Sequence, residues 1–320
     1  MGNRRWRAVL TWTGVLALSA TFLTGVQPTA SASPAPAPTG APTPGLPQLP
    51  TGSPPAVAEG GSGAPEVVIE GEDRQRVAHV RSSPHGMIGS ILVRFNGQYD
   101  RCSGAFVGPN TILTAAHCLY DPDRGGKADY IKFLAAESPA DAGYIECVVR
   151  NKENMRVPQA FINDPTDENN DFGVIKPPQC HLPATPNSAV NIIDYTGWFG
   201  WSGADRSGQI AELAGYPKEV NDVAQDGQMW FDEARITKTQ PHLIQYRMDA
   251  SVGQSGAPVF DFLNSPVPGW YVLGVHAGGG RVVTLTGFPK RNWGPRLAGQ
   301  HSQMLTTWFT RQPRPEPSTT

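Results

Sequence analysis

The 320-residue sequence has few charged residues and almost no net charge. Asp, Glu, Lys and Arg make up 17% of the residues, and the formal net charge is −2 at pH 7. The basic residues are scattered along the chain, which excludes the clustered positive surface by which proteins bind nucleic acids. We therefore expect no nucleic-acid partner.

Cysteine and histidine are also scarce, with 4 and 7 residues. None of them stands at the spacing of a zinc site, so we expect no metal and no cofactor. In an exported chain, four cysteines favour two disulfides. The sequence alone allows three pairings of Cys102, Cys118, Cys147 and Cys180.

No long apolar run occurs after residue 26, so no later stretch could cross a bilayer. The first 32 residues have arginines, then an apolar run over residues 8 to 26, then Ala30-Ser31-Ala32, which is the order of a signal peptide. A membrane anchor is the alternative, but Thr, Ser and Gly dilute the run. We expect a signal peptide over residues 1 to 32, through general or twin-arginine export, and a secreted, extracellular protein without a membrane anchor.

Two segments lack the apolar side chains that a core requires. Residues 33 to 66 are dominated by Pro, Ala, Gly, Ser and Thr, which predicts a propeptide or linker. Residues 312 to 320 are similar and predict a disordered tail. Residues 67 to 311 remain, which is long enough for a large core.

Helical periodicity is missing from most of this core region, and short apolar runs separated by Gly, Pro and Asn predict an all-β protein. A helix is expected only over residues 297 to 309, where Leu297, Leu305 and Trp308 can share a face. The expected strands are residues 88–95, 111–114, 131–134, 144–149, 172–175, 210–214, 229–231, 243–248, 257–260 and 270–275.

Two short motifs carry candidate catalytic residues. His117 lies in Thr-Ala-Ala-His-Cys after an apolar strand, and Ser255 lies in Gly-Gln-Ser-Gly-Ala-Pro. A serine hydroxyl needs a neighbouring base to become a nucleophile, and the N–H groups of Gly253 and Ser255 suit an oxyanion hole. Taken singly, the first motif favours a catalytic histidine over a strand-end histidine, whereas the second is equally compatible with a surface loop. Together they favour a serine protease, and Ala257 disfavours the Gly-x-Ser-x-Gly elbow of α/β-hydrolases.

A triad also needs a carboxylate to orient the imidazole. Asp171 opens the apolar run Asp-Phe-Gly-Val-Ile-Lys, and the order His117, Asp171, Ser255 is that of the chymotrypsin type. Asp164 and Asp167 are the competing candidates. We favour Asp171 because the strand after it can bury the carboxylate beside the histidine.

These motifs resemble those of the chymotrypsin-like, or trypsin-like, serine proteases, and especially of the secreted bacterial glutamyl endopeptidases. The resemblance lies in residues 67–77, 111–120, 171–176 and 229–280. It implies two antiparallel six-stranded β-barrels of the chymotrypsin type with a C-terminal helix. It also implies the disulfides Cys102–Cys118 and Cys147–Cys180, a monomer, and protein or peptide substrates.

The resemblance also implies a division into two halves. Residues 67–188 would form the N-terminal barrel with His117 and Asp171. Residues 189–311 would form the C-terminal barrel with Ser255 and the closing helix.

The residues that set specificity point in two directions. Asp249 stands six positions before Ser255, as in trypsin-like enzymes that cleave after Arg or Lys. His276, in Gly-Val-His-Ala-Gly-Gly, matches the histidine that lines the glutamate pocket of the glutamyl endopeptidases. A buried carboxylate needs donors or positive charge, which a histidine can supply. We therefore expect preference for Glu, loosened toward Asp because Ala250 stands where the family often has a threonine. The sequence leaves open whether Ser251 replaces the missing hydroxyl.

The junction between Glu66 and Val67 is a candidate maturation site, because a glutamate-specific enzyme could cut there. In the family the released α-amino group, here that of Val67, helps to bind the substrate carboxylate. A trypsin-like enzyme would cut instead between Arg76 and Val77. A protein of this fold that binds without turnover is the remaining alternative.

Overall fold

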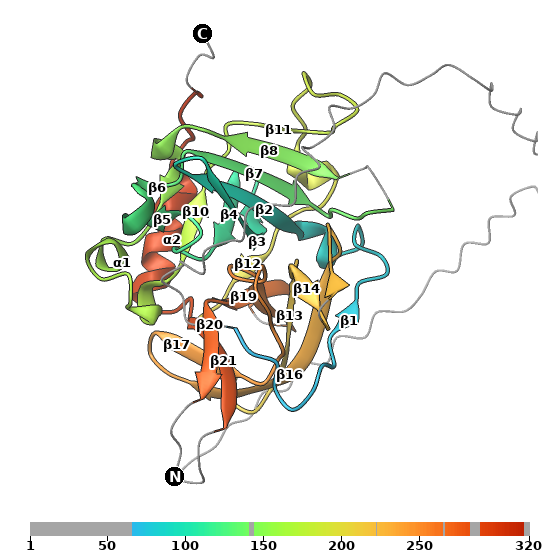
Figure 1. Ribbon diagram of the computed structural model, residues 1–320, viewed down its shortest axis with the longest axis vertical. Helices are drawn as coiled ribbons and strands as arrows, with labels where there is room; N and C mark the ends of the chain where they lie inside the picture. The colour runs from blue at the N-terminus through green and yellow to red at the C-terminus, as the bar shows by residue number, and fades with distance from the viewer. Residues whose placement is uncertain (1–65, 141–143, 222, 265, 282–288, 317–320) are drawn as a thin grey trace, which may run out of the picture. The chain divides into compact units, whose positions relative to one another are not determined.

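The structure is a computed structural model, and it describes residues 66–140, 144–221, 223–264, 266–281 and 289–316 (Figure 1). The expected signal peptide, and the Pro-rich segment up to residue 65, lie outside these residues. Among the described residues, no helix is both long and apolar enough to span a bilayer.

The first half of the chain forms an eight-stranded antiparallel sheet with the order β11-β8-β7-β2-β3-β4-β10-β9. In β2 inward-facing apolar residues alternate with half-buried ones, which is the pattern of a strand with one face on a core. Its strands are β2 (Ile88–Phe95), β3 (Gln98–Gly108), β4 (Thr111–Thr114), β7 (Tyr130–Ala135), β8 (Ile145–Val149), β9 (Met155–Arg156), β10 (Gly173–Ile175) and β11 (Cys180–His181).

The second half forms a nine-stranded sheet with the order β12-β19-β18-β13-β16-β17-β21-β20, and β1 also pairs with β16. All its pairs are antiparallel except that of β12 with β19. Its strands are β1 (Gln75–Arg76), β12 (Gly200–Trp201), β13 (Ile210–Gly215), β16 (Trp230–Thr239), β17 (Leu243–Tyr246), β18 (Pro258–Leu263), β19 (Gly269–Val275), β20 (Gly278–Arg281) and β21 (Lys290–Pro295).

Short elements complete the fold. The two-stranded ribbons are β5 (Tyr120–Asp121) with β6 (Gly126–Lys127) and β14 (Glu219–Val220) with β15 (Val223–Ala224). The helices are α1 (Gln159–Asn163), α2 (Gln300–Thr310) and the single turns η1 (His85–Met87), η2 (Pro122–Arg124), η3 (Lys152–Asn154), η4 (Glu168–Asn170) and η5 (Ile192–Asp194).

The expected all-β class and C-terminal helix are confirmed, but the strand count is not. The two large sheets hold eight and nine strands rather than six each, because several strands are only two residues long. The sheet changes between His181 and Gly200, and the expected boundary between residues 188 and 189 falls in this interval. Gln75 and Arg76, expected in the N-terminal half, pair instead with Phe231 and Trp230 of the second sheet.

The two disulfides join Cys102 to Cys118 and Cys147 to Cys180, the pairing that the family resemblance implies. The second bridge links directly opposed residues of β8 and β11. The first links β3 to the turn after β4, and this turn carries His117.

The C-terminal end of the described chain is held against the first sheet's loops. The buried Lys176 ammonium donates hydrogen bonds to Asn110 Oδ1, Thr111 Oγ1 and the Phe309 carbonyl at the end of α2. Burial lowers the pKa of Lys176 to about 8. Beyond α2, the Glu316 carboxylate accepts from the N–H groups of residues 150 and 151, so this part of the expected disordered tail makes defined contacts.

Candidate active site

His117 and Asp171 are brought together by two paired strands. In β4 and β10, Thr114 lies opposite Gly173, so the residues after β4 and those before β10 meet at one edge of the sheet. The Asp171 carboxylate accepts from the His117 backbone N–H at 2.9 Å and contacts the ring Nδ1 at 2.7 Å. Asp171 is 3% exposed.

The competing aspartates make local turns instead. Asp164 accepts from the N–H and hydroxyl of Thr166. Asp167 caps η4 by accepting from the N–H of Asn169. Of the three candidates, only Asp171 has a hydrogen bond to His117 among the described residues.

The surroundings of His117 favour its charged form. Burial lowers the pKa of His117, but the Asp171 carboxylate, assisted by Glu66 and Asp100, outweighs burial and raises the pKa above the ordinary 6.5. An imidazole with this partner is fixed with Nδ1–H toward the carboxylate, which leaves Nε2 to accept a proton. That is the arrangement a general base needs.

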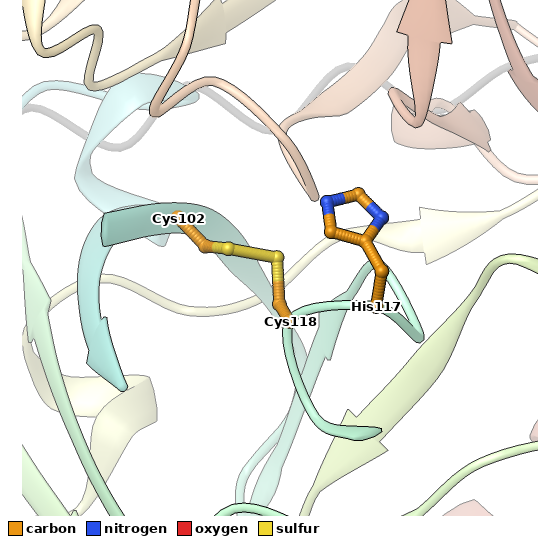
Figure 2. Close-up of side chains that lie close together, drawn as sticks. All are labelled: Cys102, His117 and Cys118. Carbon is orange, nitrogen blue, oxygen red and sulfur yellow. A yellow bond between two sulfur atoms is a disulfide. The ribbon is translucent and has the colours of Figure 1, made fainter. Parts of the chain in front are cut away.

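The disulfide between Cys102 and Cys118 lies directly beside the His117 ring (Figure 2). Ser103, the residue next to Cys102, holds the loop of residues 251–256 in place. This loop carries the candidate nucleophile Ser255 and is called the nucleophile loop below. Ser103 N–H donates to the Ser255 carbonyl at 2.8 Å, and Ser103 Oγ donates to the Gly253 carbonyl at 2.8 Å. The sulfurs are bonded to each other, so this group of side chains offers no thiolate to a metal.

The backbone of the nucleophile loop leaves two N–H groups without an acceptor among the described residues. In a planar trans peptide, C=O and the following N–H point in opposite directions. The Val252 carbonyl accepts from Lys218 N–H at 2.7 Å, and the Gln254 carbonyl accepts from Ala257 N–H at 2.9 Å. The N–H groups of Gly253 and Ser255 therefore point the other way, and neither donates to another described residue.

Glycine is required at this loop. Gly253 has a φ of 102°, in the left-handed region, and a Cβ there would lie 2.6 Å from the Tyr216 carbonyl. Gly256 has a φ of 84°, and a Cβ there would lie 2.3 Å from the Ser103 carbonyl. Gly253 permits the loop to approach the segment after β13, and Gly256 permits it to approach β3.

The side chain of Glu66 lies against the candidate nucleophile. Ser255 Oγ donates to Glu66 Oε1 at 2.5 Å, and His276 Nε2 lies 3.4 Å from the same oxygen. The Glu66 side chain is 4% exposed, and its other oxygen, Oε2, has no hydrogen-bond partner among the described residues. The Ser255 hydroxyl is thus engaged by a carboxylate of the same chain.

His276 is fully buried behind this carboxylate. Its Nδ1 lies 2.6 Å from the hydroxyl of Tyr246, which is also buried. The Tyr246 hydroxyl also lies 3.3 Å from the Trp293 carbonyl, and its single proton goes either to that carbonyl or to Nδ1. With the proton on the Nδ1 side, the neutral ring carries its own proton on Nε2, facing Glu66. Burial, with a contribution from Glu66, raises the pKa of Tyr246 well above 10, so its hydroxyl remains a donor.

Val67, next to Glu66, is fixed by backbone hydrogen bonds. Its N–H donates to Asn292 Oδ1 at 3.1 Å, and its carbonyl accepts from Asn292 Nδ2 at 2.7 Å and from Ala250 N–H at 3.3 Å. Asn292 is fully buried, so its side-chain amide is held in position to bind the backbone of one extended residue.

Asp249 and Ser251 do not contact Glu66 in the described structure. Asp249 Oδ1 accepts from Ile69 N–H at 2.6 Å, and Ser251 Oγ donates to the Glu219 carbonyl at 3.0 Å. Burial, followed by the neighbouring carboxylates of Asp73 and Asp232, raises the pKa of Asp249 to about 7. A group whose negative charge is disfavoured is a poor partner for a cationic substrate side chain.

Residues 102–267 match the trypsin-like peptidase domain family. The chain belongs to this family. It is 29% identical over 247 residues to a glutamyl endopeptidase of Bacillus licheniformis, covering 75% of this chain and 68% of the relative. It is 24% identical over 226 residues to a protein of Bacillus subtilis named extracellular metalloprotease, covering 69% and 65%.

Solved structures share the fold of this trypsin-like peptidase. A Glu endopeptidase in complex with MPD matches with a TM-score of 0.56 at 24% identity, covering 77% of this chain and 100% of the other. The protease Anisep from Arthrobacter nicotinovorans matches with a TM-score of 0.53 at 18% identity, covering 75% and 100%. The chain is a serine endopeptidase that acts on protein or peptide substrates.

Several residues of this trypsin-like peptidase site were missed from sequence. Ser103, Tyr246 and Asn292 hold the loop, the pocket histidine and Val67, yet each lies in a segment without a motif. Tyr246 stands in the run Tyr-Arg-Met-Asp, in a block that carries the family resemblance, and this position was its one available signal.

Proposed function

We propose that the protein is an endopeptidase that hydrolyses the peptide bond after glutamate. The observation that carries the proposal is the position of the Glu66 carboxylate, which is 4% exposed, 2.5 Å from Ser255 Oγ and 3.4 Å from His276 Nε2. A buried carboxylate is costly unless donors surround it. A pocket that accepts this group from its own chain has the chemistry to accept it from a substrate.

In the proposed reaction, Ser255 attacks the carbonyl carbon of the scissile bond while His117 Nε2 removes its proton. Asp171 keeps the ring oriented and stabilises the imidazolium that forms. The oxyanion accepts hydrogen bonds from the N–H groups of Gly253 and Ser255. His117 then protonates the leaving amine, and water hydrolyses the acyl-enzyme by the reverse sequence.

Selectivity rests on His276, oriented by Tyr246. The Tyr246 hydroxyl lies 2.6 Å from Nδ1 and holds the ring with Nε2 toward the carboxylate, where a protonated Nε2 can donate to it. Ala250 has no hydroxyl, and that of Ser251 is turned toward Glu219 and Arg74, so neither reaches the carboxylate. This supports a looser preference in which Asp is also accepted.

The trypsin-like alternative is disfavoured by the environment of Asp249. Its carboxylate contacts the N-terminal segment, and burial raises its pKa to about 7. An Arg or Lys side chain needs a carboxylate that is ionised and open to the pocket. A non-catalytic binding protein is disfavoured because the chain retains all three candidate residues and His117 is hydrogen-bonded to Asp171.

Maturation by cleavage between Glu66 and Val67 fits the same arrangement. Val67 is hydrogen-bonded to Asn292 in the uncut chain, and Glu66 Oε2 has no donor among the residues that the structure describes. After cleavage, Val67 bears a cationic α-amino group that can supply a donor and a charge to a substrate carboxylate. Export before maturation is supported by the signal-like residues 1 to 32 and by the extracellular relative in Bacillus subtilis.

A peptide series tests the proposal. Peptides that differ only in Glu, Asp, Arg or Phe before the scissile bond are incubated with the secreted protein and with Ser255→Ala. We expect cleavage after Glu, weaker cleavage after Asp, and none with the variant. Faster cleavage after Arg refutes the glutamate pocket, and equal cleavage by Ser255→Ala refutes the nucleophile.

Amino-terminal sequencing of the secreted protein checks the maturation site separately. We expect a chain that begins at Val67. A chain that begins at Val77 would favour the Arg/Lys alternative, because the cut then follows Arg76.

A further inference from the structure

The N-terminal segment that follows Val67 is fixed to the second sheet on both sides of Arg74. Before Arg74, Ile69 N–H donates to Asp249 Oδ1 at 2.6 Å. After it, Gln75 and Arg76 pair with β16, and Val77 N–H donates to the Met229 carbonyl at 3.0 Å. Arg74 is therefore held from both directions at one place on the sheet.

The Arg74 side chain is buried under the nucleophile loop. Its side chain is 1% exposed. Arg74 Nη1 donates to Ser251 Oγ at 2.6 Å and to Gln254 Oε1 at 2.5 Å. Ser251 and Gln254 are the two ends of the turn that contains Gly253, and Gln254 directly precedes Ser255.

The charge of Arg74 is neutralised within its own segment. Glu72 Oε1 accepts from Arg74 Nε at 2.7 Å, and Glu72 Oε2 accepts from Arg74 Nη2. The hydrogen bonds with Arg74 counter the effect of burial and lower the pKa of Glu72. Burying an ion pair is not in itself stabilising, so a buried Arg–Glu pair needs a reason other than overall stability.

The geometry of the loop supplies that reason. Gln254 Oε1 also accepts from Ser251 N–H at 3.1 Å, and Gln254 N–H donates to the Ser251 carbonyl at 3.0 Å. The Arg74 guanidinium thus links the side chains of Ser251 and Gln254, which begin and end a tight turn. Gly253 within this turn has a φ of 102°. This turn determines the direction of the Gly253 and Ser255 N–H groups.

We propose that Arg74 is a positioning residue for the oxyanion hole: its guanidinium holds Ser251 and Gln254 so that the N–H groups of Gly253 and Ser255 converge. The inference rests on the proposed catalytic function of Ser255. Arg74 touches neither substrate nor reacting atoms, and acts through the loop. The oxyanion hole then depends on a segment that lies about 180 residues earlier in the chain.

The inference predicts a specific kinetic signature. An oxyanion-hole donor acts mainly in the transition state, and loss of one lowers kcat by about 10²–10³-fold. Arg74→Met keeps an unbranched stem of similar length to the arginine's aliphatic part but removes the guanidinium, and with it both hydrogen bonds to the loop. We expect kcat for a Glu peptide to fall about 10²-fold, with KM within about threefold of wild type.

Arg76→Met is the matched control, because Arg76 lies in the same segment and donates to Gln228 instead of to the nucleophile loop. We expect its kcat to stay within about twofold of wild type. Arg74→Lys retains the charge but cannot reach Ser251, Gln254 and Glu72 together. We expect it to recover part of the kcat that Arg74→Met loses, at an unchanged KM.

The assay uses the full chain, secreted and matured, with thermal unfolding and active-site labelling by a fluorophosphonate measured on each variant. The inference requires full stoichiometry of labelling at a reduced rate. A kcat of Arg74→Met within threefold of wild type overturns it. A fall in kcat that matches a fall in labelled fraction also overturns it, because Arg74 is then only structural.

A second variant keeps the positioning role of Arg74 testable if Arg74→Met does not fold. If Arg74→Met is not secreted, Arg74→Lys decides, and wild-type kcat in that folded variant overturns the proposal. A wild-type protein without any Ser255-dependent hydrolysis refutes the proposed function itself. An active wild type with an equally active Arg74→Met refutes only the positioning role.

Discussion

The two sides of the candidate active site are built in different ways. His117 and Asp171 lie at the ends of the neighbouring strands β4 and β10 and contact each other through two direct hydrogen bonds. Ser255 and His276 depend instead on the distant segment of residues 66 to 76, which contributes Glu66, Val67 and Arg74. The proton-transfer side is therefore complete within one sheet, whereas the pocket side is completed by a segment beside the proposed maturation site.

This difference separates what each side determines. In the proposed mechanism, the His117 side provides the acid–base chemistry, which any substrate shares. The Ser255 side provides both the oxyanion hole and the contacts that select the substrate side chain. The proposed cleavage before Val67 leaves the hydrogen bonds between His117 and Asp171 in place, although the Glu66 carboxylate also contributes to the raised pKa of His117.

The largest effect is expected from the His117 side. Asp171→Asn should lower kcat by about 10⁴-fold, because the amide favours the wrong tautomer of His117. The pKa of His117 is raised by Asp171, so wild-type kcat/KM should increase as pH rises through that pKa, and the variant's acid limb should shift to lower pH. A pH–rate profile with an unmoved acid limb would count against Asp171 as the partner.

A smaller effect, confined to one substrate class, is expected from the pocket. His276→Gln should lower kcat/KM for a Glu peptide by about 10- to 100-fold, because a hydrogen bond to a charged group is worth about 1.5–3 kcal/mol. For the corresponding peptide with Gln before the scissile bond, the substitution should lower kcat/KM much less. Equal losses on both peptides would show that His276 is structural.

The stability that the protein gains where Asp249 binds the N-terminal segment should depend on pH. Asp249 has a pKa of about 7 in the fold against an ordinary 3.8, so its contribution to stability is full below 3.8 and is lost as pH rises through 7. Asp249→Asn keeps an acceptor for Ile69 N–H and cannot ionise. We expect thermal unfolding of wild type to lose about 2–4 kcal/mol more between pH 5 and 8 than the variant does.

Parallel unfolding curves of wild type and Asp249→Asn across this pH range would contradict that assignment. Asp123→Asn, an exposed carboxylate in η2, is the control for the change of residue type.

The smallest effect is expected at Tyr246. Tyr246→Phe removes the hydroxyl 2.6 Å from His276 Nδ1 and leaves the buried ring in place. We expect kcat/KM for the Glu peptide to fall about three- to tenfold, with little change for the Gln peptide. No change for either peptide would mean that His276 holds its tautomer without Tyr246.

The sequence predicted much of the fold where apolar runs were continuous. The expected strands over residues 88–95 and 111–114 coincide with β2 and β4, in which buried and half-buried residues alternate or all residues are buried. β3 was missed because its first residues, Gln-Tyr-Asp-Arg, are polar and partly exposed, although its second half is buried. The tertiary pairing with β2 outweighs this local composition.

The residues with functional motifs were also the easiest to find. His117 and Ser255 stand in recognisable motifs, and Asp171 could be chosen because an apolar strand follows it. Arg74 and Ser103 could not be found in this way, since each acts across a contact of more than 100 residues in sequence. Such contacts depend on how the sheets are brought together, which local pattern does not encode.

Isosteric peptides test most directly whether the site beside Ser255 accepts a substrate carboxylate. Two peptides that differ only in Glu or Gln before the scissile bond, and a third with Arg, are assayed with the matured protein. We predict that kcat/KM for Glu exceeds that for Gln by at least about tenfold, with Arg slower still. Equal rates for Glu and Gln, or a faster rate for Arg, would contradict the account.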